Sequence, residues 1–296
     1  MPIALRAPAS PGVRLVAGRY RLRALLGRGG MGRVWLAEDE LLHRPVALKQ
    51  AIVSDPTADG SLPYDAGHLV IEACAAATVN HKGAVTIYDV VTDKSRTWIV
   101  MEPLSGRTIA ELINVEGALS IARVAHIGLR LLDVLMAAHR VGIVHCDVKP
   151  ANVHLCDDGR VVLTDFGIAC RILDEASERT QTLAGSPPYT APERLRGGNP
   201  EPAWDMFSLG ATLFAAVEGK PPFSGSSLRN TVIAVVEGEP PPCLRAGPLR
   251  AAIEGLLAKN PADRLTGEQA HTALVDLQQK LPSGHETEVM ACGLYT

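Results

Sequence analysis

Four glycines recur within residues 27–34, GRGGMGRV, which follow the pattern G-x-G-x-x-G-x-V. Because glycine has no side chain, backbone amides in such a segment can approach the oxygens of a triphosphate closely. In a dinucleotide-binding fold this pattern joins a strand to a helix, whereas here it lies between two predicted strands, which favours a flap over phosphates. From the spacing alone, a glycine-rich hairpin that serves only as a turn stays open. The positions that define the pattern are Gly27, Gly29, Gly32 and Val34.

A single lysine, Lys49, ends the apolar segment 46–49. Such a lysine can simply extend from a sheet edge along its aliphatic stem. Glu72, on the helix predicted to follow, is available to hold the ammonium group in place for the α- and β-phosphates of a nucleotide. The two residues form a candidate ion pair at a phosphate site.

The remaining motifs are HCDVKPAN at 145–152, DFG at 165–167 and APE at 191–193. Together with the glycine-rich segment they have the order and spacing of the protein-kinase motifs, and the chain from Gly18 to about Lys280 resembles a bacterial Hanks-type serine/threonine protein kinase. One position departs from the family pattern. Cys146 stands where arginine is usual, so the chain resembles the non-RD minority of kinases, with HCD in place of HRD.

The resemblance implies ATP-dependent transfer of the γ-phosphoryl group to protein serine and threonine hydroxyls, with autophosphorylation. Asp147 would orient the attacking hydroxyl and accept its proton, and Lys149 would neutralise the transferring group. Asn152 and Asp165 would supply oxygen ligands for two Mg²⁺ ions, with Mn²⁺ able to replace them. The implied cofactors are therefore ATP and Mg²⁺.

For the adenine base, the resemblance implies contacts at the end of the predicted strand 98–101. The carbonyl of Glu102 and the amide of Leu104 match the usual hydrogen-bonding positions. The apolar surroundings and the phosphate contacts would come from Leu26, Gly27, Gly29, Gly32, Val34, Ala47, Lys49 and Met101.

Other matches concern the scaffold of the site. Glu193 and Arg264 resemble the family's buried ion pair, and Asp205 would cap the backbone of the catalytic loop, although an ordinary aspartate at a helix N-terminus is the plainer alternative. Ser186 would bond Asp147. Further structural positions are His145 and Phe166, and the expected phosphorylation sites of the activation segment are Thr180 and Thr182.

Two alternatives to an active protein kinase stay open. A pseudokinase would keep the fold as an ATP-binding regulatory module, but the residues whose loss is its usual signature are all present. A small-molecule phosphotransferase shares the two-lobed core, but that class lacks the 191–193 motif and the segment 185–189. The expected partners are proteins with serine or threonine acceptors, and the resemblance leaves a homodimer open.

The elements that must position these residues change in character along the chain. Residues 20–26, 33–38 and 45–49 read as short strands, 66–79 as an alanine-rich helix, and 84–91 and 97–101 as strands again. Beyond Pro103, Ser120 can cap a long amphipathic helix that ends at Gly142, and Thr266 with Gln269 forms a capping-box pattern.

This order predicts an α+β, bilobal protein-kinase fold, with a small five-stranded antiparallel lobe that carries one main helix and a larger, mainly helical lobe. The predicted divisions are a flexible N-terminal extension (1–18), the small lobe (19–102), the large lobe (103–280) and a polar tail (281–296).

Composition excludes other classes of protein. The 296 residues carry 29 basic and 32 acidic side chains, a formal charge of −3, which argues against a nucleic-acid partner. No apolar run approaches the ~20 residues of a membrane span, and no secretory signal is recognisable, so a cytoplasmic location is expected.

The six cysteines are widely spaced, which favours reduced thiols. Cys146 and Cys170 could nevertheless form a redox latch if their Cα atoms lie within ~7 Å.

Overall fold

The computed structural model describes residues 14–29, 32–50, 66–94, 96–166, 170–171 and 186–280. For 66–69, Glu72, Cys170 and Arg171 it describes the backbone alone. The chain forms two compact units, which are described separately. Within the described residues, the first comprises 14–77 and 85–104, and the second comprises 78–84 and 105–280.

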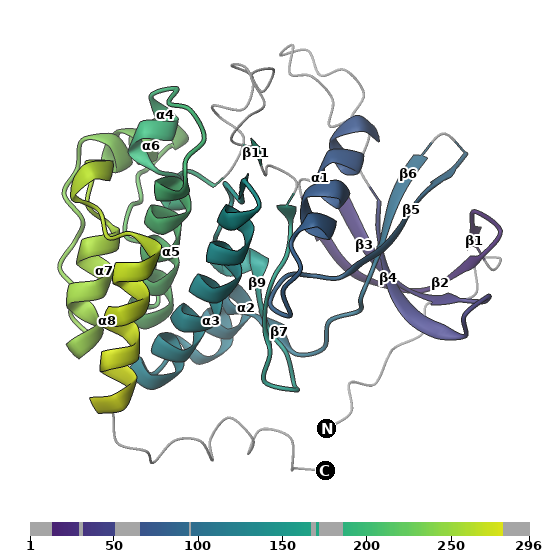
Figure 1. Ribbon diagram of the computed structural model, residues 1–296, viewed down its shortest axis with the longest axis horizontal. Coiled ribbons are helices and arrows are strands. Elements are labelled where there is room, and N and C mark those ends of the chain that lie inside the picture. Colours follow the sequence, from purple (N-terminus) through teal and green to yellow (C-terminus); the bar gives the residue numbers. More distant parts are fainter. Residues whose placement is uncertain are drawn as a thin grey trace. The chain divides into compact units, whose positions relative to one another are not determined.

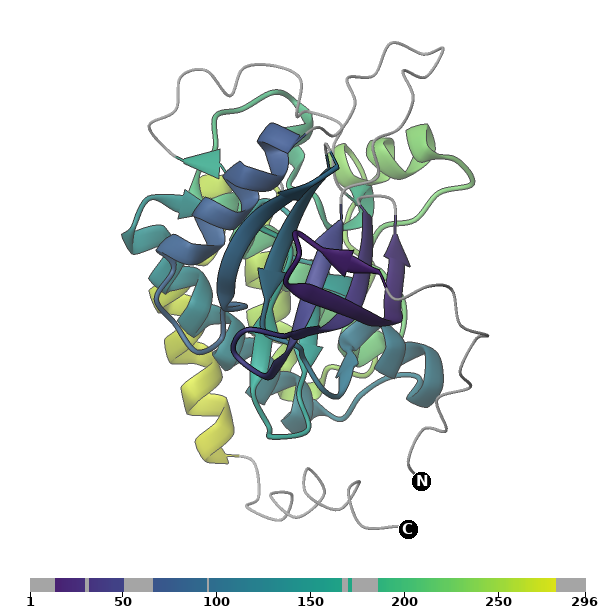
Figure 2. The ribbon, with the colours of Figure 1, turned by 90° about the vertical axis from the view of Figure 1, so that its right-hand side faces the viewer.

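The first unit is an antiparallel sheet with one helix, α1 (Ala66–Thr78), most of which belongs to this unit (Figures 1 and 2). The strand order is β1-β2-β3-β4-β6-β5. One face buries Tyr20, Leu48 and Trp98, each at most 1% exposed, and on another side Ala73 of α1 clusters with Ile99. The strands are β1 (Leu15–Val16), β2 (Tyr20–Gly29), β3 (Gly32–Asp39), β4 (Arg44–Gln50), β5 (Ile87–Asp93) and β6 (Arg96–Met101).

The sheet has six strands within the described residues, where five were expected. The additional strand, β1, lies in the segment 1–18 that was expected to be a flexible extension. Ala17 and Gly18 both have positive φ, 50° and 64°, which turns the chain sharply so that Val16 pairs with Tyr20. Val16 is fully buried, and this burial holds the two-residue strand in place.

The second unit is mainly helical. Its central helix is α5, in which all residues from Trp204 to Val217 are buried; α3 and α7 pack against it, and α8 packs against α3 (Figure 1). The helices are α2 (Ile109–Glu116), α3 (Ile121–Arg140), α4 (Pro192–Leu195), α5 (Pro202–Glu218), α6 (Leu228–Val236), α7 (Arg250–Leu256) and α8 (Gly267–Lys280). Short strands are β7 (Arg107–Thr108), β8 (Ile143–Val144), β9 (Val153–Leu155), β10 (Val161–Leu163) and β11 (Cys170–Arg171).

Both predicted helix caps are confirmed. The Ser120 hydroxyl accepts a hydrogen bond from the Arg123 amide at the start of α3. Thr266 and Gln269 bond reciprocally before α8, with Thr266 N to Gln269 Oε1 at 2.9 Å and Gln269 N to Thr266 Oγ1 at 3.3 Å. These local interactions set where the two helices begin.

The division between the units differs from the expected one. Residues 78–84 belong to the second unit, and the first unit extends to Leu104 instead of 102. The physical reason lies in the backbone: the Leu163 amide donates to the Gly83 carbonyl at 2.7 Å, and Ala84 bridges to Leu163. The expected α+β class is confirmed. Among the residues described, no helix is both long enough and apolar enough to cross a bilayer.

Candidate functional site

Lys49 is buried in the first unit, at 3% exposed. It lies opposite Val34 on β3 and opposite Ile99 on β6. Residues directly opposite each other in antiparallel strands project from the same face of a sheet, so Lys49 shares the face on which Ile99 packs against Ala73 of α1. Glu72 is the residue before Ala73, but its side chain lies outside the described part of the structure.

The end of β6 carries the residues expected to contact adenine. Met101 lies opposite Ala47 of β4. Ala47 precedes Lys49 by two residues on that strand, so Met101, Ala47 and Lys49 share one face of the sheet. Glu102 is held by two bonds to Thr86, from the Glu102 amide to the Thr86 carbonyl and from the Thr86 amide to Glu102 Oε1, both 2.9 Å. No described residue accepts a hydrogen bond from the Leu104 amide.

The glycine-rich segment spans the hairpin between β2 and β3. Gly27 lies opposite Val34, and Gly29 lies opposite Gly32; residues 30 and 31 lie outside the described part. A Cβ added to Gly27 would meet no atom within 4 Å, so neither packing nor backbone conformation within the structure requires glycine there. Leu26 beside it is 53% exposed. Open space therefore lies over the backbone at the first position of the glycine pattern.

In the second unit, two predicted residues converge on the carboxylate of a third. Asp147 lies on the loop 145–152, here called the Asp147 loop, which follows β8. Its Oδ2 accepts from Lys149 Nζ at 2.6 Å and from Asn152 Nδ2 at 3.0 Å. The Asp147 side chain is only 3% exposed. Hydrogen bonds from an ammonium group and an amide hold this buried carboxylate in a fixed position.

Asp205 of α5 holds the backbone of the Asp147 loop. Its carboxylate accepts from the amides of His145 and Cys146, each at 2.8 Å, and lies 2.7 Å from His139 Nε2. Burial by itself raises the pKa of Asp205, but the hydrogen bond and charge of His139, together with His145, lower it below its usual value on balance. Cys146 has a φ of 66°, so the carboxylate fixes an unfavourable backbone conformation.

The ring of His145 connects the loop to the segment before DFG. Its Nδ1 accepts from the Asp147 amide at 3.2 Å, its Nε2 lies 3.0 Å from the Thr164 carbonyl, and the ring meets Phe166 edge-on with centroids 4.6 Å apart. Complete burial lowers the pKa of His145, which favours the neutral ring. A neutral imidazole can accept at Nδ1 while Nε2 donates to a carbonyl.

Asn152 and Asp165 are brought to one place by the backbone. The Asn152 carbonyl accepts from both the amide and the hydroxyl of Thr164, the residue before Asp165, at 2.9 and 3.1 Å. Asn152 Nδ2 donates to the Asp147 carbonyl and carboxylate, so its side-chain oxygen is turned away from Asp147. Asp165 has a φ of 61°. An amide oxygen and a carboxylate are ligands that Mg²⁺ prefers.

The expected ion pair joins α4 to the segment before α8. Arg264 donates through Nη1 and Nη2 to the two oxygens of Glu193, at 2.6 and 3.0 Å. Its other bonds go to the carbonyls of Ala203, Ala258 and Lys259. The Arg264 side chain is fully buried, so its charge is compensated inside the protein.

The expected hydrogen bond between Ser186 and Asp147 is not formed in the described structure. The Ser186 carbonyl accepts from Tyr189 N and Thr190 Oγ1 in a 3-10 turn. Within the described residues, the Asp147 carboxylate is instead held by Lys149 and Asn152. The expected phosphorylation sites, Thr180 and Thr182, lie outside the described residues.

The alternative of a redox latch between Cys146 and Cys170 is described only in part. The Cys146 thiol donates to the Val144 carbonyl at 3.4 Å, and the backbone of Cys170 pairs with Val144. The Cys170 side chain lies outside the described part, so the latch stays a prediction.

Two contacts to the Asp147 loop, and one to the Asp205 carboxylate that holds the loop, were missed. They come from Arg194 to the Cys146 carbonyl, from Thr212 to the Val148 carbonyl, and from His139 to Asp205. The partners lie 48, 64 and 66 positions apart along the chain. No short motif connects residues so distant, and the one available signal was that Arg194 directly follows the APE motif.

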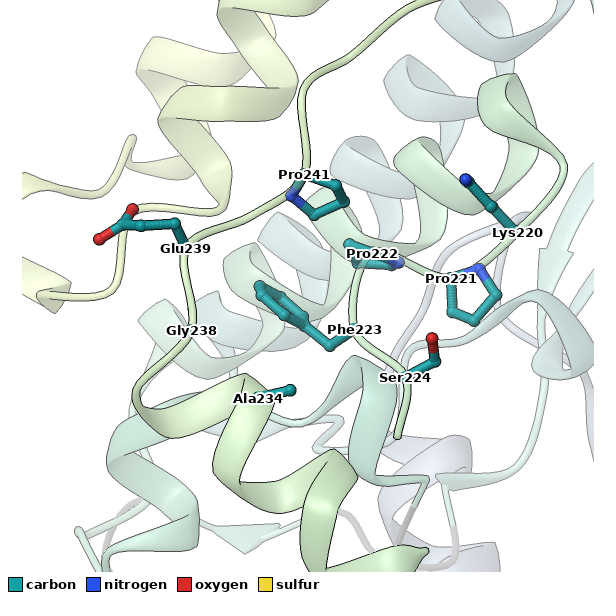
Figure 3. Close-up of a pocket in the computed structure, with 9 residues that line it drawn as sticks. All are labelled: Lys220, Pro221, Pro222, Phe223, Ser224, Ala234, Gly238, Glu239 and Pro241. Carbon is teal, nitrogen blue, oxygen red and sulfur yellow. The ribbon is translucent and has the colours of Figure 1, made fainter. Parts of the chain in front are cut away.

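Two surface cavities in the second unit involve none of the predicted site residues. One, of about 300 Å³, lies around Phe223 and Pro241 between the end of α5 and the end of α6 (Figure 3). Lys259 lies 3.8 Å from the Phe223 ring, and burial lowers its pKa to about 8. The other, of about 250 Å³, lies around His81, His126 and Arg130.

Comparison with known proteins identifies the family and several relatives of this chain. Residues 20–274 match the family model described as protein kinase domain. The chain is 36% identical over 262 residues to serine/threonine-protein kinase PknB of Mycobacterium tuberculosis, covering 84% of this chain and 41% of that protein.

Two other serine/threonine-protein kinases have similar sequence identity to this chain. Serine/threonine-protein kinase PknA of Mycobacterium tuberculosis is 37% identical over 258 residues, covering 84% of this chain and 58% of that protein. The probable serine/threonine-protein kinase PknB of Corynebacterium glutamicum is 36% identical over 219 residues, covering 72% of this chain. The chain spans only 33% of the length of this last relative.

Proposed function

Because this chain belongs to the family of bacterial Hanks-type serine/threonine protein kinases, we propose that it transfers the γ-phosphoryl group of ATP to serine and threonine hydroxyls of proteins. The observation that carries the proposal is the buried carboxylate of Asp147, held by Lys149 and Asn152 on a loop whose backbone amides bond to Asp205. Such a fixed carboxylate suits the orientation of an incoming hydroxyl.

In this proposal Asp147 accepts the proton of the attacking hydroxyl. Its Oδ2 is already bonded to Lys149 Nζ, so the ammonium group lies where negative charge develops during transfer. Phosphoryl transfer needs little covalent help from the protein, and positioning together with charge supplies most of the rate enhancement. The short, buried contacts around Asp147 are consistent with that demand.

The residues of the first unit fit a nucleoside triphosphate. Lys49 on the face shared with Val34, Ala47 and Met101 would contact the α- and β-phosphates below an apolar surface for the base. The open space over Gly27 would admit phosphate oxygens close to the backbone. The Leu104 amide and the Glu102 carbonyl would bond the adenine edge.

A divalent cation also fits, by the chemistry of its donor set. The Asn152 side-chain oxygen and the Asp165 carboxylate are hard oxygen ligands, and Thr164 ties the two residues together through the backbone. When bound, Mg²⁺ or Mn²⁺ neutralises phosphate charge. The chain's own contribution is to hold the Asn152 side chain against Asp147 and to tie Asn152 to the residue before Asp165.

The test is transfer from labelled ATP in the presence of Mg²⁺, first to a generic basic protein and then to candidate small molecules. Label on serine or threonine of the protein supports the proposal. Label on a small molecule alone favours a small-molecule phosphotransferase, and ATP binding without any transfer favours a pseudokinase. Autophosphorylation and action in the cytoplasm, where ATP is supplied, are further parts of the proposal.

A further inference from the structure

Arg194 places a buried guanidinium group against the Asp147 loop. The residue is 3% exposed, lies on α4, and donates through Nη1 to the backbone carbonyl of Cys146. Its guanidinium carbon lies 5.5 Å from the centre of the Trp204 ring. Removing a permanent charge from water is unfavourable, so a buried arginine calls for a reason.

The carbonyl that Arg194 contacts belongs to the peptide group that leads into Asp147. The Cys146 carbonyl and the Asp147 amide lie in one rigid plane. The amide edge of that plane donates to His145 Nδ1 at 3.2 Å, and the carbonyl edge accepts from Arg194. The Cys146–Asp147 peptide is therefore held at both its amide and its carbonyl. These two contacts limit rotation about the backbone bonds that orient the Asp147 side chain.

The peptide needs such restraint because Cys146 has a φ of 66°, a conformation that non-glycine residues rarely adopt. The Cys146 amide on the other side is held by Asp205. Without a donor at the carbonyl, the backbone could relax toward a commoner conformation and turn the Asp147 carboxylate.

The helix that carries Arg194 is itself anchored. The preceding residue, Glu193, forms the two-bond ion pair with the fully buried Arg264. The rigid anchor at Glu193 and the contact at Arg194 are thus adjacent in sequence. Together they connect the end of the segment 165–193 to the Asp147 loop by a direct contact.

We propose that Arg194 is a positioning residue for catalysis, which orients Asp147 by holding the Cys146–Asp147 peptide from α4. The inference rests on the proposed function, in which Asp147 is the acceptor of the hydroxyl proton. A displacement of about 1 Å in a catalytic group can cost about 100-fold in rate. Loss of this contact is therefore expected to lower turnover while leaving the separate nucleotide contacts of the first unit intact.

The experiment compares Arg194→Met and Arg194→Lys with Arg196→Met in the full chain. Arg196 follows two residues later and donates to the Val236 carbonyl, so its replacement is a matched control remote from Asp147. For Arg194→Met we expect kcat to fall about 10- to 100-fold with KM for ATP changed less than about twofold. Arg194→Lys, which can still donate to the carbonyl, recovers part of the loss, and Arg196→Met matches wild type.

A second arm identifies Asp147 as the group through which Arg194 acts. In an Asp147→Asn background, the added Arg194→Met change causes no further loss of residual transfer, because the carboxylate that Arg194 orients is already absent. Equal losses in both backgrounds, or the same loss in Arg196→Met, overturn the proposal.

Hydrogen exchange at the Asp147 amide keeps the test independent of activity. The amide exchanges faster in Arg194→Met than in wild type, while the amides of α8 do not change. Unchanged exchange at Asp147 overturns the inference even in an active enzyme, whereas an inactive wild type with the expected exchange overturns only the proposed function. If Arg194→Met does not fold, Arg194→Gln, which is too short to reach the carbonyl equally, takes its place with the same expected outcomes.

Discussion

Arg264 binds both carboxylate oxygens of Glu193, 71 positions earlier in the chain, at 2.6 and 3.0 Å. The arginine side chain is fully buried and the glutamate side chain is 15% exposed. Removing one partner of a buried pair leaves the other charge uncompensated.

Replacing Arg264 with Met is expected to lower the free energy of unfolding by about 3–5 kcal/mol, measured by urea denaturation. The matched control is Arg250→Met, which breaks the exposed pair between Arg250 and Glu254. That exposed pair contributes about 0–1 kcal/mol at most. Equal effects of the two substitutions would contradict the assignment of a buried, structural pair.

Asp147→Asn is expected to lower phosphoryl transfer by about 10²- to 10⁴-fold, the usual contribution of a positioned base. The substitution keeps the size of the side chain and removes the charge that Lys149 contacts. Nucleotide affinity, measured by titration calorimetry, stays near the wild-type value because the predicted base and phosphate contacts lie on other residues. Retained turnover would mean that another group accepts the proton.

Lys49→Met is expected to raise KM for ATP and lower kcat together, because phosphate contacts made before and during transfer are lost. The control is Lys220→Met, which removes a cation from the cavity shown in Figure 3. Steady-state kinetics on both variants provide the measurement. A fully active Lys49→Met enzyme would show that a different cation serves the phosphates.

Incubation with ATP is expected to phosphorylate Thr180, Thr182 or both, as detected by mass spectrometry. The modification should activate only weakly. Cys146 and Cys170 occupy positions where an arginine and another basic residue could bind the phosphate. Charge-assisted hydrogen bonds worth about 1.5–3 kcal/mol each are therefore missing. The neighbouring Arg171 could replace part of the missing positive charge. A large gain in activity on phosphorylation would refute the weak activation, and an unmodified segment in an active enzyme would refute the sites.

Stability is expected to fall as the pH is lowered through the range just below 6.5. Burial lowers the pKa of His145 from the ordinary value of 6.5, so the unfolded chain binds the proton first and acid favours unfolding. The contribution of this residue is fully present above pH 6.5 and can decline by at most about 1.4 kcal/mol per pH unit as the pH falls. Urea denaturation at pH 7.5, 6.5 and 5.5 measures the summed effect of His145 and of the other histidines whose pKa burial lowers, which are His81, His126 and His154. Stability that is constant or rises on acidification would contradict the buried neutral ring.

The sequence by itself determined the features that depend on neighbouring residues. The strands β2, β3 and β4, the capped starts of α3 and α8, and the α+β class followed from short-range patterns and are confirmed. The order and spacing of the motifs also indicated the family. Local patterns could do this because caps, turns and strand periodicity involve partners only a few residues apart.

Short segments whose conformation depends on distant partners were predicted less well. The two-residue strand β1 escaped prediction because it is held by the burial of Val16 and by pairing across a turn. Residues 78–84 were assigned to the first unit although their backbone bonds to β10 of the second.

Only the tertiary structure decided how the Asp147 loop is held. Asp205, Arg194 and Thr212 each reach it from 48 or more positions away. Such contacts exist only after α4 and α5 have packed, and no local pattern encodes which carbonyl a distant donor will meet. The residue types at the site could thus be read from the chain, but the restraint that aims them depends on the packing of helices far apart in sequence.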